Sequence, residues 1–178
     1  MRLYLARHTE TNYNVQHLVN SDPAVNVHLT KKGIQEARHL AEKLSDVNLE
    51  AIYISELPRT RQTAEFINQY HDLPLIVDGR INDNATGFEG RPTKEYMQAF
   101  NNSADRWREA FNDGESLEDA KNRVEEFLGM LKETGYASVL IVTSGFIIEC
   151  FYGIIYEKSF EYSTHFSIAQ GDYDVIEY

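Results

Sequence analysis

The sequence contains a single cysteine, Cys150, among its 178 residues. One cysteine can neither close an internal disulfide nor build a zinc site from thiolates, which excludes a disulfide-rich secreted module. A long apolar run is also missing. The most apolar stretch, Val139 to Ile148, has roughly half the length of a membrane span and ends at Glu149. Near the N-terminus, Arg7 interrupts the chain before a secretory apolar segment develops. We therefore expect a cytoplasmic protein with no membrane partner.

Positive charge is in short supply. Lys and Arg number 17 against 28 Asp and Glu, which gives a formal net charge of −11 at pH 7. This balance disfavours nucleic acid as a partner, because the protein would repel its phosphates. The imbalance is uneven: residues 1–62 carry eight basic and seven acidic side chains, and residues 63–178 carry nine and twenty-one. An anionic ligand should therefore bind near the first third of the chain.

The remaining composition is typical of one globular domain, and we expect a single domain over residues 1–178. Hydrophobic residues make up 42% and charged residues 25%, close to the average for such proteins. Short apolar runs alternate with segments of helical periodicity, which predicts an α/β three-layer sandwich around a mostly parallel sheet. Strands are expected at 3–5, 51–54, 75–77, 139–142, near 166–169 and at 173–177. Helices are expected at 30–44, 58–70, 94–111, 116–131 and 146–156, and an irregular stretch at 8–29.

Polar side chains follow three of the expected strands. Arg7 and His8 follow the first, Arg59 follows the second, and Ser144 follows the strand at 139–142. In open α/β sheets ligands bind beyond the carboxyl ends of the strands, so these side chains should converge. The guanidinium fork matches phosphate geometry, and a histidine beside it can act as nucleophile, acid–base group or donor. The residues predict a phosphoryl-transfer site, with a solvated loop as the alternative.

Five motifs occur in order over nearly the whole chain. They are RHTETNYN at 7–14, LTKKGIQEA at 29–37, SELPRTRQTA at 55–64, GES at 114–116 and VLIVTSG at 139–145. Together they resemble the motifs of the histidine phosphatase superfamily, also called the phosphoglycerate-mutase-like family. The resemblance implies the phosphoglycerate-mutase-like fold and a phosphomonoester hydrolase that acts through a phosphohistidine on a small-molecule substrate.

The resemblance also implies roles for individual residues. His8 would be the nucleophile, and Arg7 and Arg59 would hold the phosphoryl oxygens. Asn14 would help to line the phosphate pocket. Asp83 aligns with the family's general acid, a glutamate, and its side chain is one methylene shorter.

Three positions differ from the family pattern. Ser144 stands where the family has its second catalytic histidine, and a serine can donate a hydrogen bond but cannot carry positive charge. Thr9 replaces a glycine beside the nucleophile, and Phe146 replaces a small residue. We therefore expect a slow enzyme whose pocket is more crowded than is usual in the family.

Several alternatives stay open at this stage. Glu89, in the same glycine-bearing loop as Asp83, is the other candidate proton donor. A non-catalytic phosphate-binding or regulatory module on the same fold competes with the phosphatase. A phosphoglycerate mutase is less favoured, because such mutases carry extra segments that 178 residues leave little room for. No histidine pair has the spacing of a metal site, so neither a metal nor a cofactor is expected. The sequence does not specify the oligomeric state.

Overall fold

The computed structural model describes residues 1–159 and 167–178. A five-stranded sheet in the order β3-β2-β4-β1-β5 forms its centre. The strands are β1 (Arg2–Arg7), β2 (Ala51–Ile54), β3 (Leu75–Val77), β4 (Ser138–Thr143) and β5 (Tyr173–Glu177). The first four are parallel to their neighbours, and β5 is antiparallel to β1 at the sheet edge. The predicted mostly parallel sheet is confirmed.

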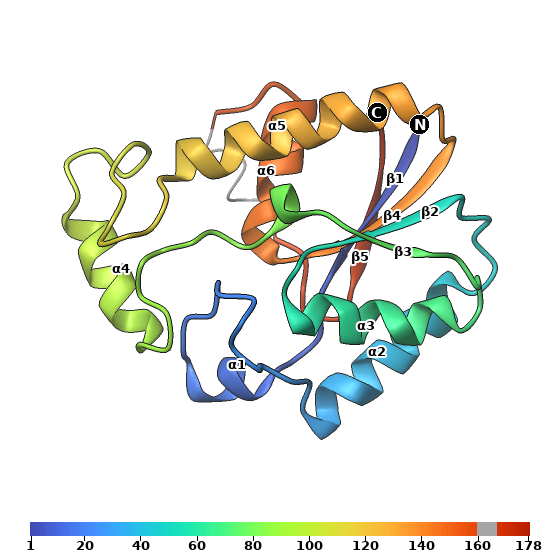
Figure 1. Cartoon of the computed structure of the whole chain (residues 1–178), viewed down its shortest axis with the longest axis horizontal. Helices are drawn as coiled ribbons and strands as arrows, with labels where there is room; N and C mark the ends of the chain where they lie inside the picture. The colour runs from blue at the N-terminus through green and yellow to red at the C-terminus, as the bar shows by residue number, and fades with distance from the viewer. Residues whose placement is uncertain (160–166) are drawn as a thin grey trace.

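Helices cover both faces of the sheet, which makes three layers (Figure 1). Helices α2 (Lys31–Leu44) and α3 (Pro58–Asn68) pack on one face, where they meet alternate strand residues such as Ile52 and Leu140. Helices α5 (Leu117–Thr134) and α6 (Gly145–Ile155) pack on the other face, against Leu5 and Ile141. The side chains of one strand alternate between the two faces, so each buried strand contributes to both cores.

Local sequence signals explain where the helices begin. Thr30 caps α2 by accepting a hydrogen bond from the Gly33 amide, and Pro58 occupies the first turn of α3, where its missing N–H is harmless. Ser116 and Asp119 form a complete capping box at the start of α5. These three starts agree with the sequence prediction.

The structure also corrects three sequence predictions. The stretch expected to be irregular contains a short helix, α1 (Asn12–Gln16), which Thr11 and Asn14 cap reciprocally. Helix α4 runs from Thr93 to Asn102 rather than to residue 111. Beyond it the Asp105 side chain accepts hydrogen bonds from nearby backbone amides, and such local bonds compete with the helix. Residues 167–169 are not a strand, and residue 166 of that predicted element lies outside the described residues.

The sheet register brings the carboxyl ends of three parallel strands to one level. Arg7 pairs with Thr143, and Ile54 pairs with Val142. The turns that follow β1, β2 and β4 therefore open on the same side, where α1 and α4 also lie (Figure 1). Strand β3 is parallel to β2 and ends on the same side, where a short 3-10 helix, η1 (Gly79–Ile81), follows it. Within the described ranges, no helix has both the length and the apolar character to cross a bilayer.

Candidate active site

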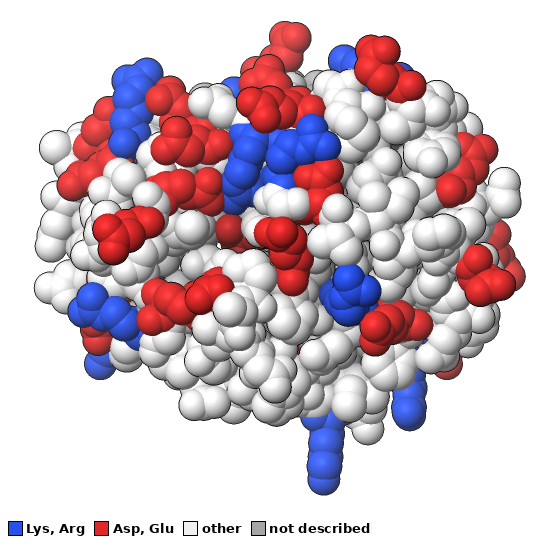
Figure 2. All heavy atoms as spheres, viewed as in Figure 1, with Lys and Arg blue, Asp and Glu red and all other residues white. Residues whose placement is uncertain are grey.

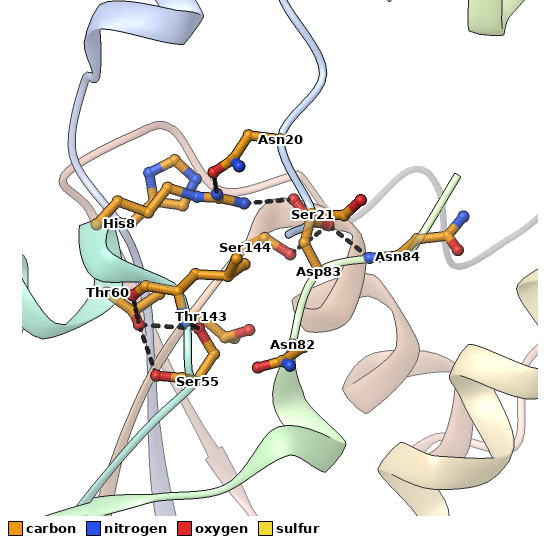
Figure 3. Close-up of polar contacts among 12 residues, drawn as sticks. His8, Asn20, Ser21, Ser55, Thr60, Asn82, Asp83, Asn84, Thr143 and Ser144 are labelled. Carbon is orange, nitrogen blue, oxygen red and sulfur yellow. Dashed lines mark hydrogen bonds and ion pairs between the residues drawn. The ribbon is translucent and has the colours of Figure 1, made fainter. Parts of the chain in front are cut away.

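A cavity of about 390 Å³ lies beyond these strand ends. It brings together all six residues that the sequence singled out for the site, namely Arg7, His8, Asn14, Arg59, Asp83 and Ser144. In the view of Figure 3, Ser144 lies between His8 and Asp83. The expected convergence of three strand ends is thus present, and the solvated-loop alternative is wrong because His8, Arg59 and Ser144 are each less than 5% exposed.

His8 is held in one orientation by the backbone around it. Its amide donates to the Thr143 carbonyl, and its ring Nδ1 lies 2.9 Å from the Thr9 carbonyl oxygen. A carbonyl can only accept, so Nδ1 carries the proton and Nε2 keeps its lone pair. Burial, followed by the charges of Arg59 and Arg7, lowers the pKa of His8 well below its ordinary value. The imidazole is therefore neutral at pH 7, with Nε2 as its free basic atom.

The two arginines of the cavity use only some of their N–H donors in hydrogen bonds to described residues. Arg7 donates from Nη1 to the Ile168 carbonyl, and Arg59 donates to Asn20 and Asp83. The Nε–H group of each guanidinium is buried and has no hydrogen-bond partner within residues 1–159 and 167–178. Buried donors without partners are rare and disfavoured. Both arginines line the cavity, where their guanidinium groups supply the positive charge that an oxyanion would need.

Gly145 allows Arg7 to reach this position. A side chain at residue 145 would place its Cβ only 3.0 Å from the Arg7 guanidinium carbon. Gly145 is also the first residue of α6, whose N-terminal end faces the cavity. The partial positive charge at that end adds to the attraction for an anion.

Asp83 is the centre of the hydrogen bonds drawn in Figure 3. Its Oδ2 accepts from Arg59 Nη2 at 2.8 Å, and its Oδ1 accepts from the Ser144 hydroxyl at 2.7 Å. The Ser144 proton is therefore directed to a carboxylate in this arrangement. Asp83 also occupies part of the Arg59 guanidinium surface that a phosphoryl group would need.

A brace from α5 holds the loop that carries Asp83. Arg123 pairs with Glu115 through two hydrogen bonds and also donates to the carbonyls of Arg80 and Asp83. Glu115 in turn accepts from the Ala85 amide. Glu115 of the GES motif thus helps to fix the backbone of the loop that carries Asp83, from outside the cavity. Sequence reasoning missed Arg123, because nothing in its helix distinguishes it from a surface arginine.

Glu89, the other candidate proton donor, has a different position. It does not line the cavity, and its carboxylate accepts from the amides of Ser21 and Asp22 and from the Asn20 side chain. Because Asn20 then accepts from Arg59, Glu89 supports the phosphate side of the cavity indirectly. Neither Asn20 nor this support was expected from the sequence.

The residues expected to crowd the cavity do so only in part. Phe146 lines it. Thr9 does not: its backbone amide and hydroxyl lie close to the Thr63 hydroxyl, and its methyl group packs toward Gly171. The expectation that Thr9 narrows the pocket is therefore wrong. Asn14 lines the cavity, but its Oδ1 is already used by Thr11 and Gln170.

One further carboxyl group lines the cavity. Glu149 lies on α6, one turn after Gly145, and its neighbours in charge are Arg7 and Asp83. Burial raises the pKa of Glu149 to about 7, and the opposing effect of Arg7 is smaller. The sequence held a signal for it, since it is the one charged residue in an otherwise apolar helix.

The whole arrangement matches a known protein family. The family model described as histidine phosphatase superfamily (branch 1) matches residues 3–178. The chain belongs to this superfamily. Its fold and its motif order, predicted from the sequence, are those of a histidine phosphatase.

Three comparisons place the chain within the superfamily. It is 30% identical to the adenosylcobalamin/alpha-ribazole phosphatase of Escherichia coli, over 99% of this chain and 90% of that protein. It is 32% identical to phosphoserine phosphatase 1 of Hydrogenobacter thermophilus, over 81% and 70%. The crystal structure of the alpha-ribazole phosphatase from Shigella flexneri superimposes with a TM-score of 0.88 at 29% identity, covering 99% and 90%. The protein is thus similar to phosphatases with different substrates.

Proposed function

We propose that the protein is a phosphomonoesterase that transfers a phosphoryl group from a small phosphate ester to His8, and from His8 to water. The observation that carries this proposal is the state of His8. Its imidazole is neutral, is oriented by the Thr9 carbonyl, and lines a cavity with two guanidinium groups. A neutral, oriented histidine beside bound phosphate is a competent nucleophile.

The two arginines supply most of the positive charge that the reaction needs. Phosphoryl transfer depends on positioning and on stabilising charge at the phosphoryl oxygens. Arg7 and Arg59 both line the cavity, and their guanidinium groups would donate to the equatorial oxygens. Asn14 lines the cavity as well.

Asp83 is the proton donor in this proposal. A phosphoryl group that binds Arg59 displaces the Asp83 carboxylate from Nη2 and brings negative charge beside it. Once it is displaced from Arg59, the Asp83 carboxyl group can carry the proton that a leaving alkoxide needs. Glu89 is less suited, because its carboxylate is engaged by backbone amides away from the cavity.

The two half-reactions can be written with these groups. The His8 Nε2 lone pair forms a bond to phosphorus, the phosphorus–oxygen ester bond breaks, and the leaving oxygen takes a proton from Asp83. A water molecule then forms a new bond to phosphorus and loses its proton to Asp83. The nitrogen–phosphorus bond breaks, and inorganic phosphate leaves.

Ser144 makes this enzyme slow. The resemblance places a histidine at this position, and a protonated imidazole would stabilise charge on the phosphoryl oxygens. The Ser144 hydroxyl is neutral and donates to Asp83 instead. A neutral hydrogen bond is about half as strong as a charged one. Because the missing charge would act mainly on the transition state, turnover should fall more than phosphate binding.

The proposal is tested by labelling with p-nitrophenyl phosphate. We expect an acid-labile, base-stable phosphoryl group on the wild-type protein, together with slow release of nitrophenol. His8→Ala should lose both, while His39→Ala, which changes an exposed histidine on α2, should keep both. Labelling that persists in His8→Ala would contradict the proposal. Phosphate binding without labelling or release would favour the binding module.

A further inference from the structure

The charge around the cavity limits which phosphate esters can enter it. Arg7 and Arg59 are the two cationic side chains among its described lining residues. Two carboxyl groups, those of Asp83 and Glu149, also line the cavity and oppose this positive charge. A phosphate dianion needs both guanidinium groups, so no described lining cation is left for a second anionic group on the substrate.

Glu149 is the carboxyl group of the cavity lining that the proposed reaction does not use. The Asp83 carboxylate is engaged by Arg59, Ser144 and the amide of Asn84. Glu149 receives no hydrogen bond from any residue in the described ranges, and it is partly exposed to the cavity. Other titratable groups that line this space are His8, Tyr13 and Tyr96. Above its pKa of about 7, the ionised Glu149 carboxylate repels an anionic leaving group at close range.

Part of the cavity lining is apolar and aromatic. Helix α4 contributes Tyr96, Met97 and Phe100, and Phe146 at the start of α6 adds a fourth such side chain. The Tyr96 ring packs 5.8 Å from both the Phe88 and Phe100 rings, which fixes this wall in place. Aromatic and apolar walls favour flat, apolar ligand groups.

The net negative charge of the protein also disfavours a second negative charge on the substrate. On the face seen in Figure 2, Lys and Arg side chains gather near the middle and are bordered by Asp and Glu. The chain as a whole carries a formal charge of −11. A substrate with an additional negative charge is therefore disfavoured before it reaches the cavity as well as inside it.

We propose that the site selects phosphate monoesters whose leaving group is apolar or aromatic and carries no second negative charge, and that Glu149 is the residue that excludes the second charge. This inference rests on the proposed phosphatase function and names its substrate class. It separates such esters from carboxylated ones, for example phosphoglycerate.

The test uses two esters that differ only in one remote carboxylate: benzyl phosphate and its para-carboxylated derivative. Their leaving alkoxides are alike, so the ratio of their kcat/KM values reports recognition. At about pH 8, where Glu149 is mostly ionised, we expect the wild-type protein to prefer benzyl phosphate by about tenfold or more. Glu149→Gln should remove most of this preference, and Glu149→Lys should reverse it. Glu95→Gln on α4 removes the same charge outside the cavity lining and should leave the ratio as in the wild type.

A binding experiment makes the result independent of turnover. The affinities of benzylphosphonate and its para-carboxylated analogue, measured by calorimetry, should show the same preference and the same loss of it in Glu149→Gln. Equal affinities in the wild-type protein, or a preference that persists in Glu149→Gln, would overturn the inference. Absence of turnover with the binding preference intact would overturn the proposed function alone.

Discussion

Ser144 donates its hydroxyl proton to Asp83, at an Oγ–Oδ1 distance of 2.7 Å. The residue that the family resemblance places at the position of a catalytic histidine therefore contacts the proposed acid rather than pointing a free donor at the phosphate. The two residues come from different strand ends, 61 positions apart in the chain. The effect of a substitution at either residue should therefore depend on the side chain at the other.

Replacing Ser144 by histidine should raise kcat more than it changes KM. The hydrogen bond from an imidazolium to the phosphoryl oxygens becomes stronger in the transition state, where these oxygens carry more charge. One preorganised donor of this kind typically changes the rate by about a hundred- to a thousandfold. Phe146 lines the same cavity and would crowd the new ring, so we expect a gain of about tenfold, rising in the double variant Ser144→His/Phe146→Gly. Steady-state kinetics with p-nitrophenyl phosphate measures this. Flat turnover with His8 still open to labelling would favour the binding module.

Asp83→Asn should slow esters with poor leaving groups far more than esters with good ones. An alkoxide needs a proton as it leaves, and general acid catalysis is worth about a hundred- to ten-thousandfold. A nitrophenolate leaves without one. The kcat/KM ratio of an alkyl to a nitrophenyl ester should therefore fall by about a hundredfold.

Glu89→Gln serves as the matched carboxylate control for this experiment. Its contacts with the loop at 20–22 support Arg59 through Asn20, so we expect a higher KM and an unchanged dependence on the leaving group. A loss of the dependence in Glu89→Gln rather than in Asp83→Asn would exchange the two roles.

Inorganic phosphate should stabilise the folded protein. It would bind the guanidinium groups of Arg7 and Arg59, which line the cavity, and a ligand that binds only the folded state at about a hundred times its Kd adds about 2.7 kcal/mol. For a chain of this size that corresponds to a rise in Tm of roughly 5–10 °C. Thermal melts with and without phosphate measure it. Arg59→Met should lose the rise, and Arg61→Met, an exposed arginine on the same helix, should keep it.

Glu149→Gln should stabilise the protein in alkaline solution and have little effect in acid. The folded state raises the pKa of Glu149 from its ordinary 4.5 to about 7, so it favours the protonated form. That stabilisation is complete below about pH 4.5 and is lost as the pH rises to about 7. Above that, the charged carboxyl destabilises the fold by an amount on the order of 1–2 kcal/mol, which the amide removes. Urea unfolding at about pH 5 and pH 8 tests this, with the exposed Glu133→Gln as control. Equal gains at both pH values would contradict the argument.

The fold could be predicted because its signals are local. Apolar runs mark the buried strands, and Thr30, Pro58 and Ser116 mark helix starts by side-chain chemistry that acts within three residues. The end of α4 could not be predicted, because the aromatic residues beyond Asn102 continue a helical pattern. Phe111 instead packs against Tyr96 from a loop, a contact that only the folded chain defines.

The candidate site was predictable to the level of which residues meet, and no further. The positions of His8, Arg59 and Ser144 follow from strand ends and parallel pairing. The contacts of Asp83 depend on a loop whose path is set by Arg123 on α5 and by Glu115, just before α5. Long-range bonds of this kind leave no periodic signal in the sequence.

The ion pair between Arg59 and Asp83 has a consequence for the end of the catalytic cycle. Inorganic phosphate that leaves the site would otherwise expose a guanidinium group that is only 4% exposed to water. After Asp83 passes on the proton that it took from water, its carboxylate can move back onto Arg59 as phosphate departs, so the guanidinium group exchanges one anion for another. Such an exchange lowers the affinity for the product, and it limits inhibition by the phosphate that the enzyme itself releases.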